Sequence, residues 1–216
     1  MRHFVNAVRS PWLLGCLVVG LSMCCLICCC GGMLFCPCAG EPLPERNFKV
    51  ANLLINVSAF PEGWMADSGP SIPASAPLGG VYDIERTLLS FGTSDGSCGA
   101  SEEIYRFSSI KGAQQDFERR LDVNFTVGEY DTPWVVPEEL SYQSFVADQF
   151  YYSCSTHGCT LYCQMLGRYE EYVVVFSTGI SPDFMTYRDF EYLLQAIDEQ
   201  MAQVLDKSRF LVPPPR

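Results

Sequence analysis

Histidine is nearly absent from this sequence, which contains only His3 and His157. The sequence also lacks a Gly-x-Ser-x-Gly motif and a glycine-rich phosphate-binding loop. A hydrolytic nucleophile needs a base beside it, and imidazole is the usual one, so these absences argue against hydrolytic catalysis. We therefore predict that the protein is not an enzyme, has no catalytic residue and carries no cofactor.

Charge is missing from positions 10–40, which hold no acidic or basic residue. The densest apolar part, residues 12–35, would extend about 36 Å as a helix, against about 30 Å of bilayer hydrocarbon. We predict one transmembrane anchor over residues 12–36. Two alternatives stay open. One is a cleaved signal peptide, whose apolar run is normally shorter, and the other is a lipoprotein signal ending at Cys16, which little apolar sequence precedes.

Most of the cysteines lie in or beside this apolar segment. They are Cys16, Cys24, Cys25, Cys28, Cys29, Cys30, Cys36 and Cys38. Small side chains allow helices to pack closely in lipid, and cysteines beside a bilayer can also carry S-acylation. We favour packing, which makes the lipid bilayer and other membrane protein subunits the expected partners of the anchor.

Basic residues are scarce after Gly40, where 12 of them accompany 25 acidic residues and the formal net charge is −13. Such a domain repels phosphate backbones, so we expect no nucleic acid partner. The domain also contains four cysteines and two Asn-x-Ser/Thr sequons, at Asn56 and Asn124. With Arg2 and Arg9 on the short N-terminal side, these features predict a domain on the extracytoplasmic side of the membrane.

The change of composition along the chain predicts five parts. A short cytoplasmic N-terminus (1–11) precedes the anchor (12–36), and a linker rich in proline and glycine (37–47) follows it. One extracytoplasmic domain covers residues 48–206, a length that is usual for a single hydrophobic core. A proline-rich tail (207–216) comes after the domain.

Aromatic and β-branched residues predict five strands in the domain, at 82–91, 103–108, 142–152, 159–166 and 169–177. Apolar residues at helical spacing predict two helices, one around 113–121 that Ser108 or Ser109 caps, and one that opens at Ser181. A polar break at 155–158 predicts a hairpin loop. The fold class is therefore α+β, an antiparallel β-sheet packed with helices.

Several short motifs support this arrangement. The domain opens with Phe60-Pro61-Glu62-Gly63-Trp64 and has the helix around 113–121 in its middle. The segment Gly167-Arg168-Tyr169 then leads into Val173-Val174-Val175, and an amphipathic helix closes the domain. In these motifs and their order the chain resembles the α/β/α sandwich of the PsbP-like superfamily, which includes exported bacterial lipoprotein and sensor domains. The resemblance covers residues 48–206. It includes no catalytic motif, so it implies a fold and an exported location but no activity.

The four cysteines of the domain are Cys98, Cys154, Cys159 and Cys163. Four cysteines allow three pairings, and we predict two disulfides among them. If residues 155–158 form a four-residue loop, Cys154 faces Cys159 across the hairpin and Cys98 is left for Cys163. The alternative is a zinc site in which His157 joins the thiolates of Cys154, Cys159 and Cys163, although this spacing matches no common zinc motif.

Aromatic side chains are the other candidates for a binding site. Trp64, Trp134 and Tyr151, with Phe150 and Tyr152 beside the last of them, could line a ligand groove, although aromatic strand residues are more often core residues. The sequence therefore predicts a membrane-anchored, non-catalytic module that binds a ligand or a protein. An accessory structural subunit of a larger membrane protein complex is the alternative.

Overall fold

The computed structural model describes residues 43, 45–72, 83–128 and 131–205. All of them belong to one compact unit that begins at Leu43. The predicted cytoplasmic N-terminus, transmembrane anchor and proline-rich tail lie outside the described residues. Within the described part of the chain, no helix is both long and apolar enough to cross a bilayer.

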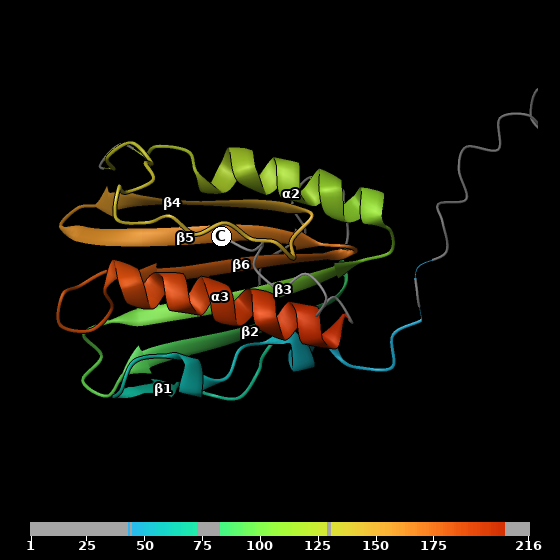
Figure 1. Cartoon of the computed structure of the whole chain (residues 1–216), viewed down its shortest axis with the longest axis horizontal. Coiled ribbons are helices and arrows are strands. Elements are labelled where there is room, and N and C mark those ends of the chain that lie inside the picture. Colours follow the sequence, from blue (N-terminus) through green and yellow to red (C-terminus); the bar gives the residue numbers. More distant parts are fainter. Residues whose placement is uncertain (1–42, 44, 73–82, 129–130, 206–216) are drawn as a thin grey trace, which may run out of the picture. The chain divides into compact units, whose positions relative to one another are not determined.

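A six-stranded sheet forms the centre of the domain (Figure 1). Its strands are β1 (Trp64–Ala66), β2 (Asp83–Thr93), β3 (Gly99–Phe107), β4 (Gln149–His157), β5 (Thr160–Tyr169) and β6 (Tyr172–Gly179). They lie in the order β1-β2-β3-β6-β5-β4, so β1 and β4 are the two edges of the sheet. Every neighbouring pair is antiparallel, which confirms the predicted type of sheet.

Helices cover both faces of this sheet (Figure 1). Helix α3 (Tyr187–Val204) packs on one face, together with the short 3-10 helices η1 (Val50–Leu53) and η2 (Val57–Ala59). Helix α2 (Ile110–Asn124) packs on the other face. The domain is therefore an α+β fold in which an antiparallel sheet lies between helices, as the sequence predicted.

The alternation of side chains along the central strands gives the sheet a core on each face. Ile104 and Val174 belong to the core under α3, whereas their chain neighbours Tyr105 and Val173 belong to the core under α2. Val173 and Val174 of β6 are both fully buried. A strand that is apolar on both faces can lie only in the interior of the sheet, and β6 does.

Helix α3 begins later than predicted. Its N-cap is Thr186, whose hydroxyl accepts a hydrogen bond from the Asp189 N–H, while the Asp189 carboxylate accepts one from the Thr186 N–H. This reciprocal capping box satisfies two backbone donors at the start of the helix. The predicted start, Ser181, instead pairs with Met185 in a turn that precedes the helix.

Helix α2 agrees more closely with the prediction. Ser109 is its N-cap, and the hydroxyl of Ser109 accepts a hydrogen bond of 3.0 Å from the Gly112 N–H. Ala113 and Phe117, four residues apart on one side of the helix, are buried against the sheet. The helix thus presents the predicted apolar side to the core.

The hairpin between β4 and β5 turns later than predicted. Its two-residue turn consists of Gly158 and Cys159, and Gly158 has a φ of 59°, which glycine adopts without strain. Most of the predicted loop at 155–158 is therefore strand. The shift places Cys154 opposite Cys163, and not opposite Cys159.

A long connection, residues 125–148, joins α2 to β4 and runs along the outer edge of that strand. The Thr132 N–H donates to the Thr156 carbonyl at 3.0 Å, and Val135 exchanges two hydrogen bonds with Cys154, of 2.9 and 2.8 Å. This pairing stops at Pro137, where the connection turns away. The connection therefore covers only one part of the β4 edge.

Candidate functional site

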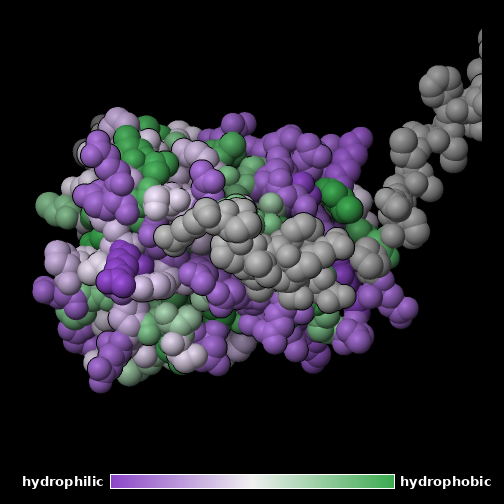
Figure 2. Space-filling model, viewed as in Figure 1, coloured by the Kyte–Doolittle hydropathy of each residue, from purple (hydrophilic) through white to green (hydrophobic). Residues whose placement is uncertain are grey.

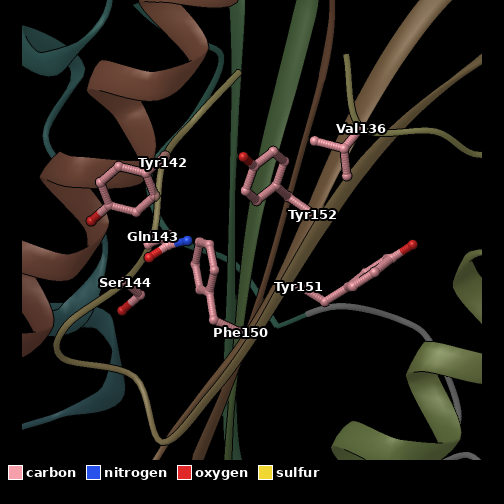
Figure 3. Close-up of a pocket in the computed structure, with 7 residues that line it drawn as sticks. All are labelled: Val136, Tyr142, Gln143, Ser144, Phe150, Tyr151 and Tyr152. Atoms are coloured by element: carbon pink, nitrogen blue, oxygen red, sulfur yellow. The ribbon is translucent and has the colours of Figure 1, made fainter. Parts of the chain in front are cut away.

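A surface pocket of about 360 Å³ lies beside the β4 edge of the sheet (Figure 3). Its lining residues come from the connection and from β4, and are Val136, Tyr142, Gln143, Ser144, Phe150, Tyr151 and Tyr152. The connection thus borders the pocket twice, once at Val136 and again at residues 142–144. An apolar and aromatic lining with a few polar groups is the usual composition of a ligand-binding pocket.

The aromatic rings of the pocket are held by the core beneath them. Tyr142 meets Phe150 edge to face with 5.7 Å between ring centroids, Phe150 meets Tyr152 at 6.0 Å, and Tyr152 meets Phe190 of α3 at 6.3 Å. Such contacts stabilise aromatic pairs beyond simple burial. Figure 3 shows the Tyr142, Phe150 and Tyr152 rings close together, whereas Tyr151 points to the other side of the strand.

A buried carboxyl group lies behind the pocket wall. Asp198 of α3 accepts hydrogen bonds from the hydroxyls of Tyr142, at 2.5 Å, and Tyr169, at 2.6 Å. Burial raises the pKa of Asp198, and the hydrogen bonds that it accepts, including one from Ser144, act in the opposite direction. Because Tyr142 and Ser144 both line the pocket and both bond to Asp198, this carboxyl fixes one wall of the pocket.

A second acidic side chain lies deep in the core, on β3. Glu102 is fully buried, and its Oε2 accepts a hydrogen bond of 2.9 Å from the Ile55 N–H. Its Oε1 has no hydrogen-bond partner among the described residues. Burial raises the pKa of Glu102 to about 8. The group is therefore mostly protonated at neutral pH, and it does not belong to the pocket lining.

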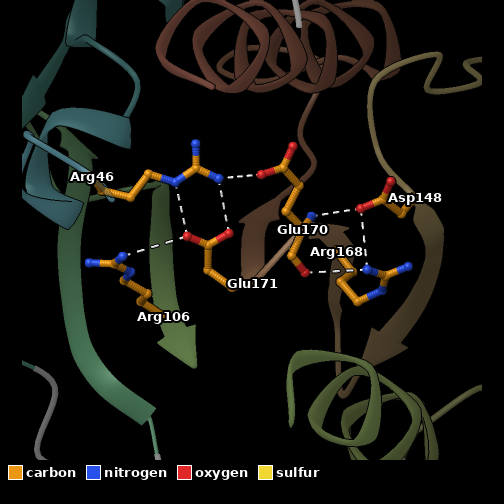
Figure 4. Close-up of polar contacts among 6 residues, drawn as sticks. All are labelled: Arg46, Arg106, Asp148, Arg168, Glu170 and Glu171. Atoms are coloured by element: carbon orange, nitrogen blue, oxygen red, sulfur yellow. Dashed lines mark hydrogen bonds and ion pairs between the residues drawn. The ribbon is translucent and has the colours of Figure 1, made fainter. Parts of the chain in front are cut away.

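An ion-pair cluster fixes the start of the domain to the turn between β5 and β6 (Figure 4). Arg46 donates two hydrogen bonds of 3.0 Å to the buried carboxylate of Glu171 and also pairs with Glu170. Arg106 lies 3.6 Å from the same Glu171 carboxylate. Arg46 falls within the predicted linker, so the folded domain begins before residue 48. These contacts are structural, because the arginines and carboxylates pair with one another.

The cysteines are paired differently from the prediction. Cys154 and Cys163 form a disulfide between β4 and β5, whereas Cys98 and Cys159 carry free thiols. The predicted pairs Cys154–Cys159 and Cys98–Cys163 are therefore wrong, because the strand register brings Cys163 and not Cys159 to Cys154. Cys159 is exposed in the turn, and partial burial raises the pKa of the Cys98 thiol.

The zinc alternative does not fit this arrangement. Cys154 and Cys163, two of its four expected ligands, are used in the disulfide. The His157 side chain is exposed, and its Nδ1 lies 2.5 Å from an Asp131 carboxylate oxygen. In the part of the chain that the structure describes, no three histidine, cysteine or acidic side chains are grouped as metal ligands.

The aromatic residues predicted to form a groove come together only in part, because the two tryptophans do not line the pocket. Trp64 lies on β1, at the opposite edge of the sheet from β4, and its Nε1 donates to the Phe184 carbonyl at 3.0 Å. Trp134 packs edge-on against Phe125, with 5.0 Å between centroids. Only Tyr151 lines the pocket, together with its neighbours in β4. The four lining residues that the connection supplies could not be predicted, because that segment has no periodic pattern.

Hydrophobic side chains are also exposed around the pocket. Val135, Val136 and Phe145, all on the connection, are exposed by 58%, 50% and 58%. Figure 2 shows that hydrophobic residues on the visible face of the molecule lie as separate spots among hydrophilic ones. The segment that borders the aromatic pocket therefore also carries exposed apolar side chains, a feature that is common at binding surfaces.

Comparison with known proteins shows a similarity in structure but none in sequence. No protein-family model and no curated protein matches the sequence. Among solved structures, the chain is similar to the extracellular domain of PknH from Mycobacterium tuberculosis, with a TM-score of 0.54 and 10% sequence identity, over 77% of this chain and 100% of that chain. At this identity the similarity shows a shared fold. It does not establish the predicted PsbP-like relationship.

Proposed function

We propose that the protein is a membrane-anchored, non-catalytic module that binds a ligand or a protein outside the cytoplasm, through the pocket at the β4 edge. The observation that carries the proposal is the pocket itself. Its lining consists of aromatic, aliphatic, amide and hydroxyl side chains. This composition suits recognition by contact, whereas a general base beside a nucleophile would be needed for hydrolysis.

Three observations support the extracytoplasmic location. Residues 12–36 form an uncharged apolar run long enough to span a bilayer. The Cys154–Cys163 disulfide is typical of oxidising compartments. The similar solved structure is itself an extracellular domain. An exported PsbP-like domain would have the same layered order, so that relationship is part of this proposal.

Protease treatment of sealed cells tests the location. We expect added protease to digest the domain while an epitope before residue 10 stays protected and the intact N-terminus is retained. A domain that resists protease until the cells are lysed would contradict the proposed side of the membrane. A mature protein that begins at Cys16 or near Ala39 would contradict the transmembrane anchor.

A blocking substitution tests the pocket. Gln143 lines the pocket and is exposed, so Gln143→Trp adds a large ring to the pocket without disturbing the core. The matched control is Ile84→Trp on β2, which is 58% exposed and lies four strands away from β4. The probe is indole, and its binding is monitored through the NMR signals of Phe150 and Tyr152.

We expect indole to shift these two signals in the natural chain and in Ile84→Trp, and to lose at least about tenfold in affinity in Gln143→Trp. Equal indole binding in all three proteins would show that the pocket is not the binding site. A metal- or substrate-dependent turnover that survives purification would contradict the non-catalytic part of the proposal.

A further inference from the structure

The part of the β4 edge that the connection leaves uncovered lies beside the pocket. Cys154 directs its backbone N–H and C=O away from β5, since both bond to Val135. Backbone direction alternates along an antiparallel strand, so Tyr152 and Phe150 direct their N–H and C=O groups to the same outer side. Among the described residues, none bonds to these four backbone groups.

Pro137 explains why the pairing between the connection and β4 ends after Val135. The register that pairs Val135 with Cys154 would bring Pro137 opposite Tyr152. Proline has no N–H to donate, and Pro137 also opens a turn in which the Leu140 N–H donates to its carbonyl at 3.1 Å. The connection therefore leaves the sheet at this residue, and no other described residue pairs with the edge of β4 beyond it.

The open edge and the pocket share residues. Phe150 and Tyr152 supply the four outward backbone groups, and their rings line the pocket. A chain that paired with these groups would direct alternate side chains to the two faces of the sheet. Every second side chain would thus lie on the side of the Phe150 and Tyr152 rings. This combination of an open edge and an adjoining side-chain pocket is the arrangement by which sheets bind extended peptides.

Four acidic residues lie near this edge in space or in sequence. The acidic residues are Glu138 and Glu139, which follow Pro137, and Glu191 and Glu199, which lie on α3 close to Tyr152 and Tyr142. The nearest basic side chain on the partner strand, Arg168, is bonded to Gln149 at 2.6 Å and to Asp148 at 3.2 Å. The charge of the site therefore complements lysine and arginine, in agreement with the net charge of −13 after Gly40.

We infer that the uncovered edge of β4 binds an extended, basic peptide segment of a partner protein, which adds to the sheet as a further strand. The outward backbone groups of Phe150 and Tyr152 pair with its main chain. An apolar side chain of the segment enters the pocket, and its basic side chains lie near Glu191 and Glu199. This inference rests on the proposed function, because the same pocket takes part in both.

Amide hydrogen exchange, followed by NMR on the full chain in detergent micelles, tests the pairing. The probe is the peptide acetyl-Lys-Val-Lys-Val-Lys-Val-Lys-amide, and its control has glutamate in place of every lysine. At saturation the basic peptide slows exchange of the Phe150 and Tyr152 amides by at least about tenfold. The amides of Tyr151 and Ser153 already pair with β5, so they exchange slowly with or without peptide.

Backbone methylation of the probe separates strand addition from simple side-chain binding. Only every second amide of an added strand faces β4, so two peptides are compared, each methylated at one of the two alternating sets of amides. One methylated peptide binds like the parent, and the other binds at least about tenfold more weakly because its hydrogen bonds are lost. Equal binding of the two methylated peptides would overturn the inference.

The remaining outcomes are also decisive. Tighter binding of the glutamate peptide would contradict the basic partner. Peptide binding that appears only in a chain ending at Leu205 would mean that residues 206–216 occupy the edge, which overturns a separate partner. If indole binds as expected while the basic peptide leaves the Phe150 and Tyr152 amides unchanged, the pocket function stands and the peptide inference fails. If neither probe binds, both fail.

Discussion

The buried carboxyl of Glu102 gives the most direct thermodynamic test of the fold. Glu102 lies in β3, is fully buried, and has one hydrogen bond, from the Ile55 N–H. Burial raises its pKa from an ordinary value of 4.5 to about 8. The folded domain therefore holds Glu102 in its protonated form over a pH range in which the unfolded chain has already released that proton.

The size of the effect follows from proton linkage. Below pH 4.5 the group is protonated in both states, and its contribution to the free energy of unfolding is fully present. That contribution is lost as the pH rises from 4.5 to about 8, at about 1.4 kcal/mol for each pH unit. The total loss is about 5 kcal/mol, which is large against the usual stability of a single domain.

The variant Glu102→Gln removes this titration while keeping an oxygen that can accept from the Ile55 N–H. We expect Glu102→Gln to lose much less stability than the natural domain between pH 4.5 and pH 8, as measured by urea unfolding at a series of pH values. Glu138→Gln, at an exposed position of the connection, is the control and should follow the natural domain. If the curves of Glu102→Gln and the natural domain stay parallel from pH 4.5 to pH 8, Glu102 is not a buried, protonated group.

Three further variants, one of them a double substitution with its own control, test the packing around the sheet by urea unfolding. Replacing Cys154 and Cys163 by serine should cost about 2–3 kcal/mol, because the disulfide closes a short loop, whereas Cys159→Ser in the exposed turn should change nothing measurable. Arg46→Ala should cost about 3 kcal/mol, since it leaves a fully buried carboxylate without its bidentate partner; an unchanged midpoint would show that this cluster does not hold the domain start. Gly167→Ala should cost about 1–3 kcal/mol, because the added Cβ would meet a buried tyrosine ring at 2.7 Å, and a neutral result would refute this close contact.

The sheet and its helices could be predicted because their patterns are long. The apolar run of β6 has no polar face, and only an interior strand covered on both sides can accommodate it. The buried residues of α3 recur at helical spacing from Phe190 to Ala202. The start of α3 was predicted too early because Ser181 is also a good capping residue, and only the reciprocal bonds of Thr186 and Asp189 distinguish the true cap.

The hairpin register could not be predicted from the same patterns. Strand β4 is aromatic on both faces, so moving the turn by a few residues leaves the hydrophobic pattern almost unchanged. The turn forms at Gly158, which has a positive φ. The position of this turn determines the strand register, and the register determines which cysteine faces Cys154. An error in the turn therefore became an error in the disulfide pairing.

The pocket could be predicted only in part. Phe150, Tyr151 and Tyr152 were recognised as groove candidates, but the other wall comes from a connection without helical or strand periodicity. Its position depends on tertiary contacts such as the bond from Tyr142 to Asp198, which are 56 residues apart in the sequence. Pro137 is a local sequence signal for the place where the connection leaves β4, since proline cannot donate a hydrogen bond to a neighbouring strand.

Site-specific photocrosslinking in native membranes tests the central claim most directly. A compact diazirine side chain placed at Gln143, in the wall of the pocket, is similar in size to glutamine and leaves the pocket open, so it should form a defined adduct with the molecule that the domain binds. The same side chain at Ile84, on the exposed surface of β2, should not form that adduct. We predict that the adduct from position 143 disappears when Val136→Trp fills the pocket. An identical adduct from positions 143 and 84, or one that persists with Val136→Trp, would contradict binding at the β4 edge.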